Sequence, residues 1–429
     1  MEPATIALLG IAVLFLLMFF KMPISFAMFI VGFAGLLVMS SPQATYNLLS
    51  SGVWTSYSSY TLSVIPLYIL MGEIIFRTGV TVKLFDAAYK WVGQFKGGMA
   101  GTTILASAGF ASICGSNAAT AAAMGTMALP ELKKYNYNEA LSTGSVATGG
   151  TLGIIIPPST VLIVIAIQTE QSITDLFVAS IIPSILLTAL LLLTIVYLCQ
   201  RNPEYGPAAP KVSMKEKLMS ILGVIPILLL FLFVIGGLFL GWFTPTESGA
   251  FGAFGAIVLT LAMKKLTFSK FKEAMLSTLK TATMVMMLMV SATLFGRFLA
   301  MTRLPYDVAD WVNGLPVPAT LILLAIILIY VIGGSIMDAL GFLIISIPIF
   351  YPTIIALGYD PVWFAVLLCV VTSMGAITPP VGVNVFVVQG LTPTTKITTI
   401  FKGASYFLIT YIVFIAILIL FPQLVLMAI

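Results

Sequence analysis

The chain of 429 residues contains no histidine, only three cysteines and few charged residues, which make up 8% of the sequence. The absence of histidine excludes His-containing metal sites and the Ser-His or Cys-His pairs of hydrolases. Three cysteines (Cys114, Cys199 and Cys369) do not make a disulfide framework. Tyr-Asp pairs occur at 306–307 and 359–360, but the G-x-G-D motif of intramembrane aspartyl proteases is missing. An enzymatic function is therefore not expected.

Hydrophobic residues dominate what remains: they form 60% of the chain, and the mean hydropathy is +1.13. A soluble domain is about half apolar and about a quarter charged. At about 20 residues per helical span, apolar stretches cover most of the chain and leave no room for a separate soluble domain. The net charge of +5 is better explained by membrane topology than by nucleic-acid binding. The composition predicts an all-α polytopic membrane protein.

An internal repeat is the most informative feature. Shifting the sequence by 222 residues superposes Gly and Pro residues at several places: Pro23 on Pro245, Pro130 on Pro352, Gly153 on Gly375, and Pro157-Pro158 on Pro379-Pro380. Chance alignment of frequent residues is the alternative. We interpret residues 1–199 and 218–429 as two repeats, joined by a polar cytoplasmic connector at 200–217.

Each predicted repeat contains two interrupted elements. Residues 101–130 and 333–352 are apolar but broken by Gly, Ser, Asn or Asp, which is typical of helical hairpins that enter the membrane and turn back. Residues 140–167 and 361–391 each contain a Pro-Pro pair and are predicted to be broken transmembrane helices. The stretch at 318–332 is predicted to be a separate span.

The distribution of lysine and arginine predicts orientation. With Lys21 inside, most of the 20 basic residues fall in cytoplasmic loops, and each repeat has an odd number of crossings. The second repeat is then inverted relative to the first. Residues 81–96 and 304–314 are predicted to be equivalent surface helices on opposite faces, and the aromatic stretch at 46–60 is predicted to be an interfacial helix.

Inverted repeats with paired interrupted helices are typical of secondary transporters, because broken helices free backbone carbonyls for cations and aim helix N-termini at anionic substrates. Each hairpin tip and the facing break predict one cation site. The first site comprises Ser112, Gly115, Ser116, Asn117, Thr148, Gly150, Gly153 and Pro157. The second comprises Gly333, Gly334, Ser335, Asp338, Thr372, Ser373, Gly375, Thr378 and Pro379. The alternative is that these small residues only allow helices to pack closely.

Three acidic residues lie in or beside predicted spans. Asp338 is inside a predicted hairpin, where it could favour a cation, hydrogen-bond substrate, or merely cap a helix. Glu73 is four residues before Arg77 and is predicted to form a structural ion pair. Glu247 follows Pro245 at the start of a span and is predicted to be a helix cap.

Four sequence motifs resemble one transporter family over essentially the full chain. The strings GFASICGSNAATAAAMG, GTLGIIIPPST, FTPTESGAFGA and GAITPPVGVNVF look like the large membrane subunit of tripartite ATP-independent periplasmic (TRAP) transporters. The resemblance implies an elevator-type transporter of the bacterial inner membrane, with a fixed scaffold domain and a mobile transport domain. It also implies uptake of a carboxylate-bearing organic acid, driven by two or more Na⁺ ions.

The same resemblance implies a small four-helix membrane subunit and a soluble periplasmic binding protein as partners, and no nucleotide. It places substrate between the two ion sites, and we assign to substrate binding Ser116, Asn117, Pro158, Asp338, Pro380 and Asn384. Sialic acid is the substrate that the sequence most resembles, and C4-dicarboxylates are the main competitor. A stand-alone sodium/dicarboxylate elevator carrier and a channel are the other candidate classes.

Overall fold

The computed structural model describes residues 2–429, which form α-helices joined by loops, with no strand in that range. Six helices are long and apolar enough to cross a membrane: α10 (Ile173–Arg201), α11 (Met214–Phe239), α13 (Phe268–Met301), α15 (Ala319–Ile336), α16 (Ala339–Ala356) and α19 (Ile397–Leu420). Two bent pairs pass the same test: α3 (Pro42–Tyr57) with Thr61–Arg77, and α8 (Glu139–Ile155) with α9 (Thr160–Gln168). The predicted all-helical membrane architecture is confirmed.

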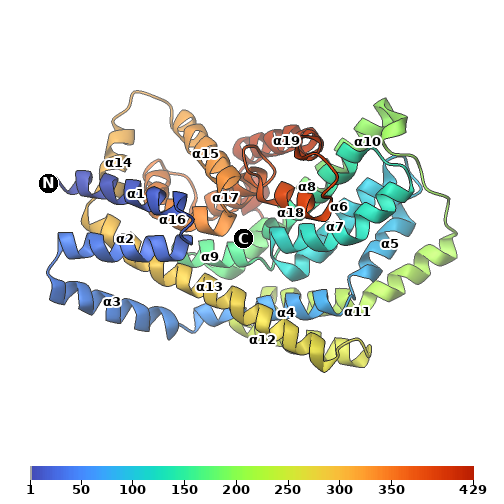
Figure 1. Ribbon diagram of the computed structural model, residues 1–429, viewed down its shortest axis with the longest axis horizontal. Coiled ribbons are helices and arrows are strands. Elements are labelled where there is room, and N and C mark those ends of the chain that lie inside the picture. The colour runs from blue at the N-terminus through green and yellow to red at the C-terminus, as the bar shows by residue number, and fades with distance from the viewer. Residues whose placement is uncertain (1) are drawn as a thin grey trace.

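One layer is built around α13, the longest helix, and lies along the lower side of Figure 1. We call it the α13 layer; its helices are α2 (Ile24–Met39), α3, α4 (Val64–Arg77), α11, α12 (Pro245–Ala262) and α13, with α1 (Pro3–Phe19) packed on α2. Helix α13 contacts α2, α3 and α4, and α12 contacts α4 and α11. The α4–α12 contact is close because Gly249 has no Cβ, which would lie 3.1 Å from the Cβ of Leu67.

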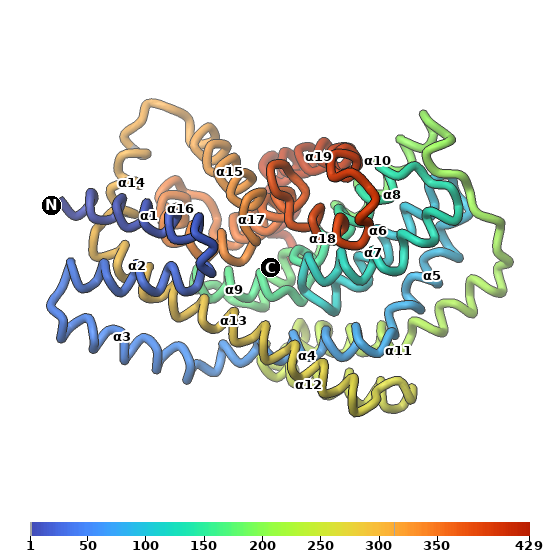
Figure 2. Tube along the Cα trace, viewed as in Figure 1, coloured from blue at the N-terminus to red at the C-terminus, as the bar shows by residue number. Residues whose placement is uncertain are grey.

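The second layer, which we call the hairpin layer, contains segments from both halves of the chain. Its helices are α6 (Gly98–Cys114), α7 (Asn117–Lys134), α8, α9, α10, α15, α16, α17 (Pro361–Gly375), α18 (Val383–Leu391) and α19. Figure 2 shows these green and orange-red segments beside one another, above α13. Helix α8 contacts α6, α7, α17, α18 and α19 and is buried from Ala140 to Ile155, so the core of the layer surrounds it.

Helices α8 and α17 begin and end alike, 222 residues apart. The side-chain oxygen of Asn138 accepts hydrogen bonds from the first backbone N–H groups of α8, and Asp360 does the same for α17. Helix α8 ends at Ile155, two residues before Pro157, and α17 ends at Gly375, four residues before Pro379. Neither proline has an N–H group with which the helical hydrogen-bond ladder could continue. These ends recur at the offset of the predicted internal repeat; the repeat and the inverted orientation of the two halves stay predictions.

Each expected hairpin range contains a junction between two consecutive helices. Helices α6 and α7 meet at Gly115 and Ser116, inside the expected range of 101–130. The second expected range, 333–352, takes in the end of α15, the junction at Met337-Asp338 and most of α16. The stretch at 318–332 lies in α15, which is by itself long and apolar enough to cross a membrane, as predicted for a separate span. Both glycines near the end of α15 are helical: Gly333 packs against Phe342 of α16, and Gly334 packs against Thr372 of α17.

Shorter helices connect these parts. The expected surface helices at 81–96 and 304–314 correspond to α5 (Val82–Val92) and α14 (Leu304–Asn313), and the aromatic stretch falls mostly in α3. The connector expected at 200–217 is irregular between α10 and α11 apart from one short turn, and its last four residues belong to α11. The chain ends in the short helix α20 (Gln423–Leu426).

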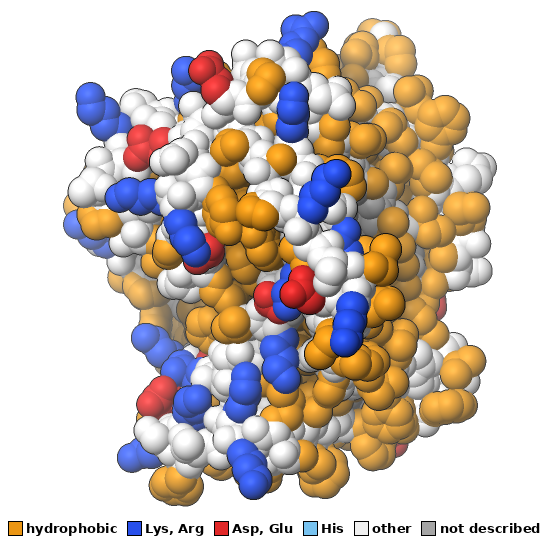
Figure 3. All heavy atoms as spheres, turned by 90° about the vertical axis from the view of Figure 1, so that its right-hand side faces the viewer, with side chains coloured by type: hydrophobic (Ala, Val, Ile, Leu, Met, Phe, Trp, Pro, Cys, Tyr) orange, Lys and Arg blue, Asp and Glu red, His pale blue; other side chains and the backbone are white. Residues whose placement is uncertain are grey.

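Charged side chains gather at one end of the molecule. Figure 3 looks at the end that carries α5 and the start of α11, where lysine and arginine side chains are frequent and border a large apolar surface. Basic residues on these elements are Lys83, Lys90, Lys215 and Lys217. The basic residues predicted to be cytoplasmic thus include a set that shares one end of the fold, as expected for a membrane protein with a cytoplasmic face.

Candidate functional site

The tip of the first hairpin rests directly on the first Pro-Pro break. Gly115 ends α6 with φ +62°, and a Cβ there would lie 2.8 Å from the carbonyl oxygen of Pro158. The Thr160 hydroxyl donates to the carbonyl oxygen of Gly115 at 2.9 Å. On α8, a Cβ at Gly153 would lie 2.4 Å from the carbonyl oxygen of Ser116. Backbone therefore meets backbone at the predicted first cation site.

The second hairpin meets the second break in the same manner. A Cβ at Gly375 would lie 2.6 Å from the carbonyl carbon of Gly334, and one at Gly334 would lie 3.1 Å from the carbonyl oxygen of Thr372. The carbonyl oxygen of Ser335 accepts hydrogen bonds from the backbone N–H groups of Val381 at 3.2 Å and Gly382 at 2.9 Å. The structure thus brings these members of the predicted second cluster together.

Side chains from the second half join the two clusters. The Ser373 hydroxyl donates to the carbonyl oxygen of Thr151 at 3.3 Å, and these residues are 222 positions apart. The Asn384 amide, on α18, donates to the carbonyl oxygen of Ala147 at 3.0 Å and lies against Gly150 of α8. No sequence motif predicts the Ser373–Thr151 contact, because it depends on how α8 and α17 pack.

Three predicted site residues carry buried oxygen atoms without a hydrogen-bond partner: Asn117 Oδ1, Thr148 Oγ1 and Asn384 Oδ1. A fourth such atom, Ser107 Oγ, lies against Gly149 and was missed by sequence reasoning. A buried polar group without a partner costs about 1–3 kcal/mol, so these oxygens are suited to a ligand or ion. Within residues 2–429, no group of three or more His, Cys, Asp or Glu side chains is placed to hold a metal. Oxygen ligands of this kind suit hard cations, in contrast to the thiolate and imidazole ligands of Zn and Cu sites.

The remaining predicted residues lie around these contacts with different exposure. Asp338 caps α16 by accepting a hydrogen bond from the Leu340 N–H at 3.2 Å, and its side chain is exposed. The Ser112 and Thr378 hydroxyls donate to carbonyls of the preceding turn. The first Pro-Pro pair, Pro157-Pro158, is buried, whereas the second pair, Pro379-Pro380, is exposed. Gly333 is buried against the ring of Phe342 in the other arm of its hairpin.

The first hairpin tip also touches the α13 layer. A Cβ at Gly72 on α4 would lie 3.1 Å from both the Cα of Cys114 and the carbonyl oxygen of Ile113. Only a residue without a side chain lets the two backbones approach this closely. Sequence reasoning missed Gly72, because a single glycine in an apolar helix carries no sign of its partner.

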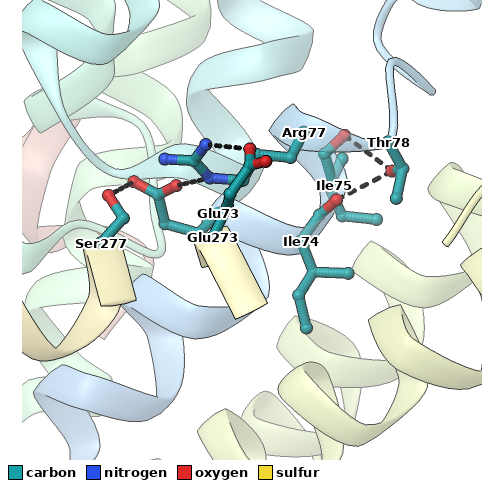
Figure 4. Close-up of polar contacts among 7 residues, drawn as sticks. All are labelled: Glu73, Ile74, Ile75, Arg77, Thr78, Glu273 and Ser277. Carbon is teal, nitrogen blue, oxygen red and sulfur yellow. Dashed lines mark hydrogen bonds and ion pairs between the residues drawn. The ribbon is translucent and has the colours of Figure 1, made fainter. Parts of the chain in front are cut away.

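The next residue on α4, Glu73, belongs to a polar network drawn in Figure 4. Its carboxylate pairs with Arg77 at 2.9 Å, which confirms the predicted ion pair, and accepts a hydrogen bond from Ser277 at 2.7 Å. Arg77 also contacts Glu273 of α13 at 3.0 Å. These contacts fix α4 to α13 beside the hairpin tip. Glu247 forms the predicted cap, in a capping box with Thr244.

Comparisons with known proteins agree with this architecture. Residues 11–424 match the family model described as tripartite ATP-independent periplasmic transporter, DctM component. The C4-dicarboxylate TRAP transporter large permease protein of Pseudomonas aeruginosa is 35% identical and covers 83% of both chains. The sialic acid TRAP transporter large permease protein of Vibrio cholerae is 28% identical and covers 95% of this chain and 94% of its own. The YdaH transporter of Alcanivorax borkumensis has a similar fold, with a TM-score of 0.63, 16% identity and coverage of 89% and 90%.

Proposed function

Since the chain belongs to the DctM component family of tripartite ATP-independent periplasmic transporters, we propose that it takes up an organic acid in symport with Na⁺ by an elevator mechanism. Family membership makes it a multi-pass inner-membrane protein and the large membrane subunit of a TRAP system for organic acids. The coupling ion, the mechanism and the substrate are the parts that we propose.

Two features of the site support Na⁺ coupling. The backbone of each hairpin packs against a broken helix, and buried neutral oxygen atoms lie beside the first of these two contacts. Asn117 Oδ1 and Asn384 Oδ1 have no hydrogen-bond partner, and the adjoining breaks supply carbonyl groups. Backbone carbonyl oxygens freed at a broken helix coordinate Na⁺ in secondary transporters, and we propose that the buried amide and hydroxyl oxygens beside them complete the site. We assign one ion to each hairpin-and-break cluster; Asp338 adds negative charge near the second.

The elevator mechanism is supported by the division into two layers. Both hairpins and both broken helices belong to the hairpin layer, while α2, α4 and α13 form a separate layer secured by the Glu73–Arg77–Glu273 network. We propose that the hairpin layer moves as one body past the α13 layer and carries the ions and substrate with it. The contact between the first hairpin and Gly72 is then one end of this movement.

The substrate is proposed to lie between the two ion clusters. Helices α7 and α18 begin there, and the N-terminus of a helix favours a carboxylate because its first N–H groups are free. Ser116, Asn117 and Asn384 stand at these starts. Sialic acid remains a prediction from the motifs, but the relatives do not single it out: the Pseudomonas relative is named for C4-dicarboxylates and the Vibrio relative for sialic acid.

A reconstitution experiment tests this proposal. Proteoliposomes containing the chain would be assayed for uptake of radiolabelled sialic acid and succinate, with and without an inward Na⁺ gradient. The candidate small membrane subunit and periplasmic binding protein would each be included or omitted. We expect uptake of one of the two acids only with Na⁺ and both partners. Uptake by the chain alone would support a stand-alone carrier, and uptake indifferent to Na⁺ would refute the coupling.

A further inference from the structure

An apolar groove lies between α11 and three parts of the hairpin layer: α6, α10 and the first Pro-Pro break. Its volume is about 580 Å³. One wall is formed by α11 with Phe231, Ile235 and Phe239, and the other by α6, α10 and the start of the first Pro-Pro break, where Pro157 lines it. The groove therefore lies between the two layers and reaches the edge of the first predicted ion cluster.

The walls of the groove present few free hydrogen-bonding groups to water. Its two hydroxyl-bearing residues, Ser184 and Thr188, donate to carbonyl oxygens of their own helix at 2.6 and 2.7 Å. A buried water needs two to four polar partners, so this groove is suited to hydrocarbon. An apolar cavity of about 150 Å³ accepts a benzene-sized molecule, and the larger volume here suits a long alkyl chain.

The groove is continuous with the surface that faces the bilayer. Ile185 is 65% exposed and Leu232 is 53% exposed at its rim. Leu228 and Leu229 extend this apolar surface along α11, and both α10 and α11 are long and apolar enough to cross the membrane. Lipid hydrocarbon is thus the surrounding solvent at the opening. An empty groove would lose the dispersion contacts of its walls, whereas an entering acyl chain restores them.

We propose that an acyl chain of a membrane phospholipid occupies this groove as a resident ligand, wedged between α11 and the hairpin layer against Ile156 and Pro157. The chain lies where the two layers would otherwise be in direct contact. This site is independent of the proposed Na⁺ coupling and of the identity of the transported acid.

Gly236 provides a specific way to fill the groove. It lines the groove from α11, and a Cβ at this position meets nothing within 4 Å, so a larger side chain can grow into the free space. Gly296 of α13 is a matched control, because a Cβ there also meets nothing within 4 Å but the residue does not line the groove. We would compare Gly236→Phe with Gly296→Phe, and add Gly236→Leu in case the phenylalanine variant does not fold.

The test uses proteoliposomes made with a phospholipid that carries a photoactivatable diazirine in its acyl chain. After illumination, mass spectrometry maps the lipid adducts. We expect adducts on the inner wall at Ala108 and Ile156 in the wild type and in Gly296→Phe, and their loss in the Gly236 variants. Adducts on Leu229, which faces outward from α11 and does not line the groove, should be equal in all variants.

Three outcomes would overturn the lipid site. The first is a wild type that carries adducts on Leu229 but none on the inner wall. The second is a monodisperse Gly236 variant that keeps its inner-wall adducts. The third is loss of those adducts when the small membrane subunit is added, since this would identify a partner helix as the occupant. None of these results bears on Na⁺-driven uptake, so the failure of this proposal is distinguishable from failure of the proposed function.

Discussion

At the scale of single residues, the amide oxygens of Asn117 and Asn384 have no hydrogen-bond partner, and this favours a role in binding over a role in packing alone. At Asn117 a packing role needs no polar atom and alanine would serve, whereas Asn384 also has a structural role, because its amide N–H donates to the carbonyl oxygen of Ala147. Both oxygens are instead buried without a partner at the tips and breaks of interrupted helices. Such an arrangement costs stability unless something binds there.

Replacing Asn117 with alanine is expected to reduce Na⁺-driven uptake by about tenfold or more, because a hydrogen bond or ligand to a charged group contributes about 1.5–3 kcal/mol. The folded protein should not be destabilised, since the lost oxygen has no hydrogen-bond partner. Uptake and the melting temperature in detergent would be measured together. The exposed Asn202→Ala serves as the control. Normal uptake by the Asn117 variant would remove this residue from the ion site.

Asp338 requires a test that distinguishes charge from helix capping. Asparagine is as good an N-cap as aspartate but carries no charge. We expect Asp338→Asn to raise the Na⁺ concentration needed for half-maximal uptake, because the negative charge near the second cluster is lost. If the Na⁺ dependence of this variant is unchanged and only Asp338→Ala is impaired, the residue is a cap of α16 and nothing more.

At the scale of elements, the site depends on close contact between hairpin tips and broken helices. Gly153 and Gly375 occupy equivalent places, 222 residues apart. Gly153 faces the backbone of Ser116 at the first hairpin tip, and Gly375 faces the backbone of Gly334 in the last turn of α15. The Pro-Pro pairs end α8 and α17 beside these glycines. The elements therefore place their backbones, rather than long side chains, around the proposed ions.

Valine at Gly153 or Gly375 is expected to abolish uptake, since even a Cβ would lie 2.4 Å from the nearest backbone atom at Gly153 and 2.6 Å at Gly375. The hairpin tip would have to move away from the break. Gly296→Val is the matched control, because a Cβ there meets nothing within 4 Å. Full uptake by a folded Gly153 or Gly375 variant would show that the tip need not approach the break.

The contact between α4 and the first hairpin gives a further prediction. Leucine at Gly72 would force the Cys114 end of α6 away from α4, because a Cβ there would already lie 3.1 Å from backbone atoms. We expect strongly reduced uptake with little change in the melting temperature, since only one end of the proposed movement is blocked. Uptake at the level of Gly296→Leu would mean that this approach is not part of the transport cycle.

At the scale of the whole molecule, the features that could be predicted from the sequence are the helix breaks that Gly and Pro residues determine locally. The breaks at 140–167 and 361–391 were located because a Pro-Pro pair cannot continue a helix. Gly333 and Gly334 look like a break in the sequence, but both lie within α15, where they pack against Phe342 and α17. Local composition does not reveal such a tertiary partner.

Contacts between distant segments could not be predicted from one sequence. Three contacts join different helices of the chain. They are the Ser373–Thr151 hydrogen bond, the approach of Gly72 to Cys114, and the contacts of Ser277 and Glu273 with the Glu73–Arg77 pair. Tertiary contacts of this kind assign helices to the two layers, and the proposed boundary between the fixed and the moving part follows from that assignment. That boundary is what the structure adds to the motifs.

The most direct test of the central claim is Na⁺ binding to the purified chain, measured by the shift of its melting temperature with NaCl against KCl at constant ionic strength. A ligand that binds one site of the folded state only raises the free energy of unfolding by RT ln(1 + L/Kd), where L is the free ligand concentration. We predict a rise specific to Na⁺ that Asn117→Ala and Asn384→Ala weaken. Equal stabilisation by Na⁺ and K⁺, unchanged in both variants, would contradict the account of the hairpin tips as Na⁺ sites.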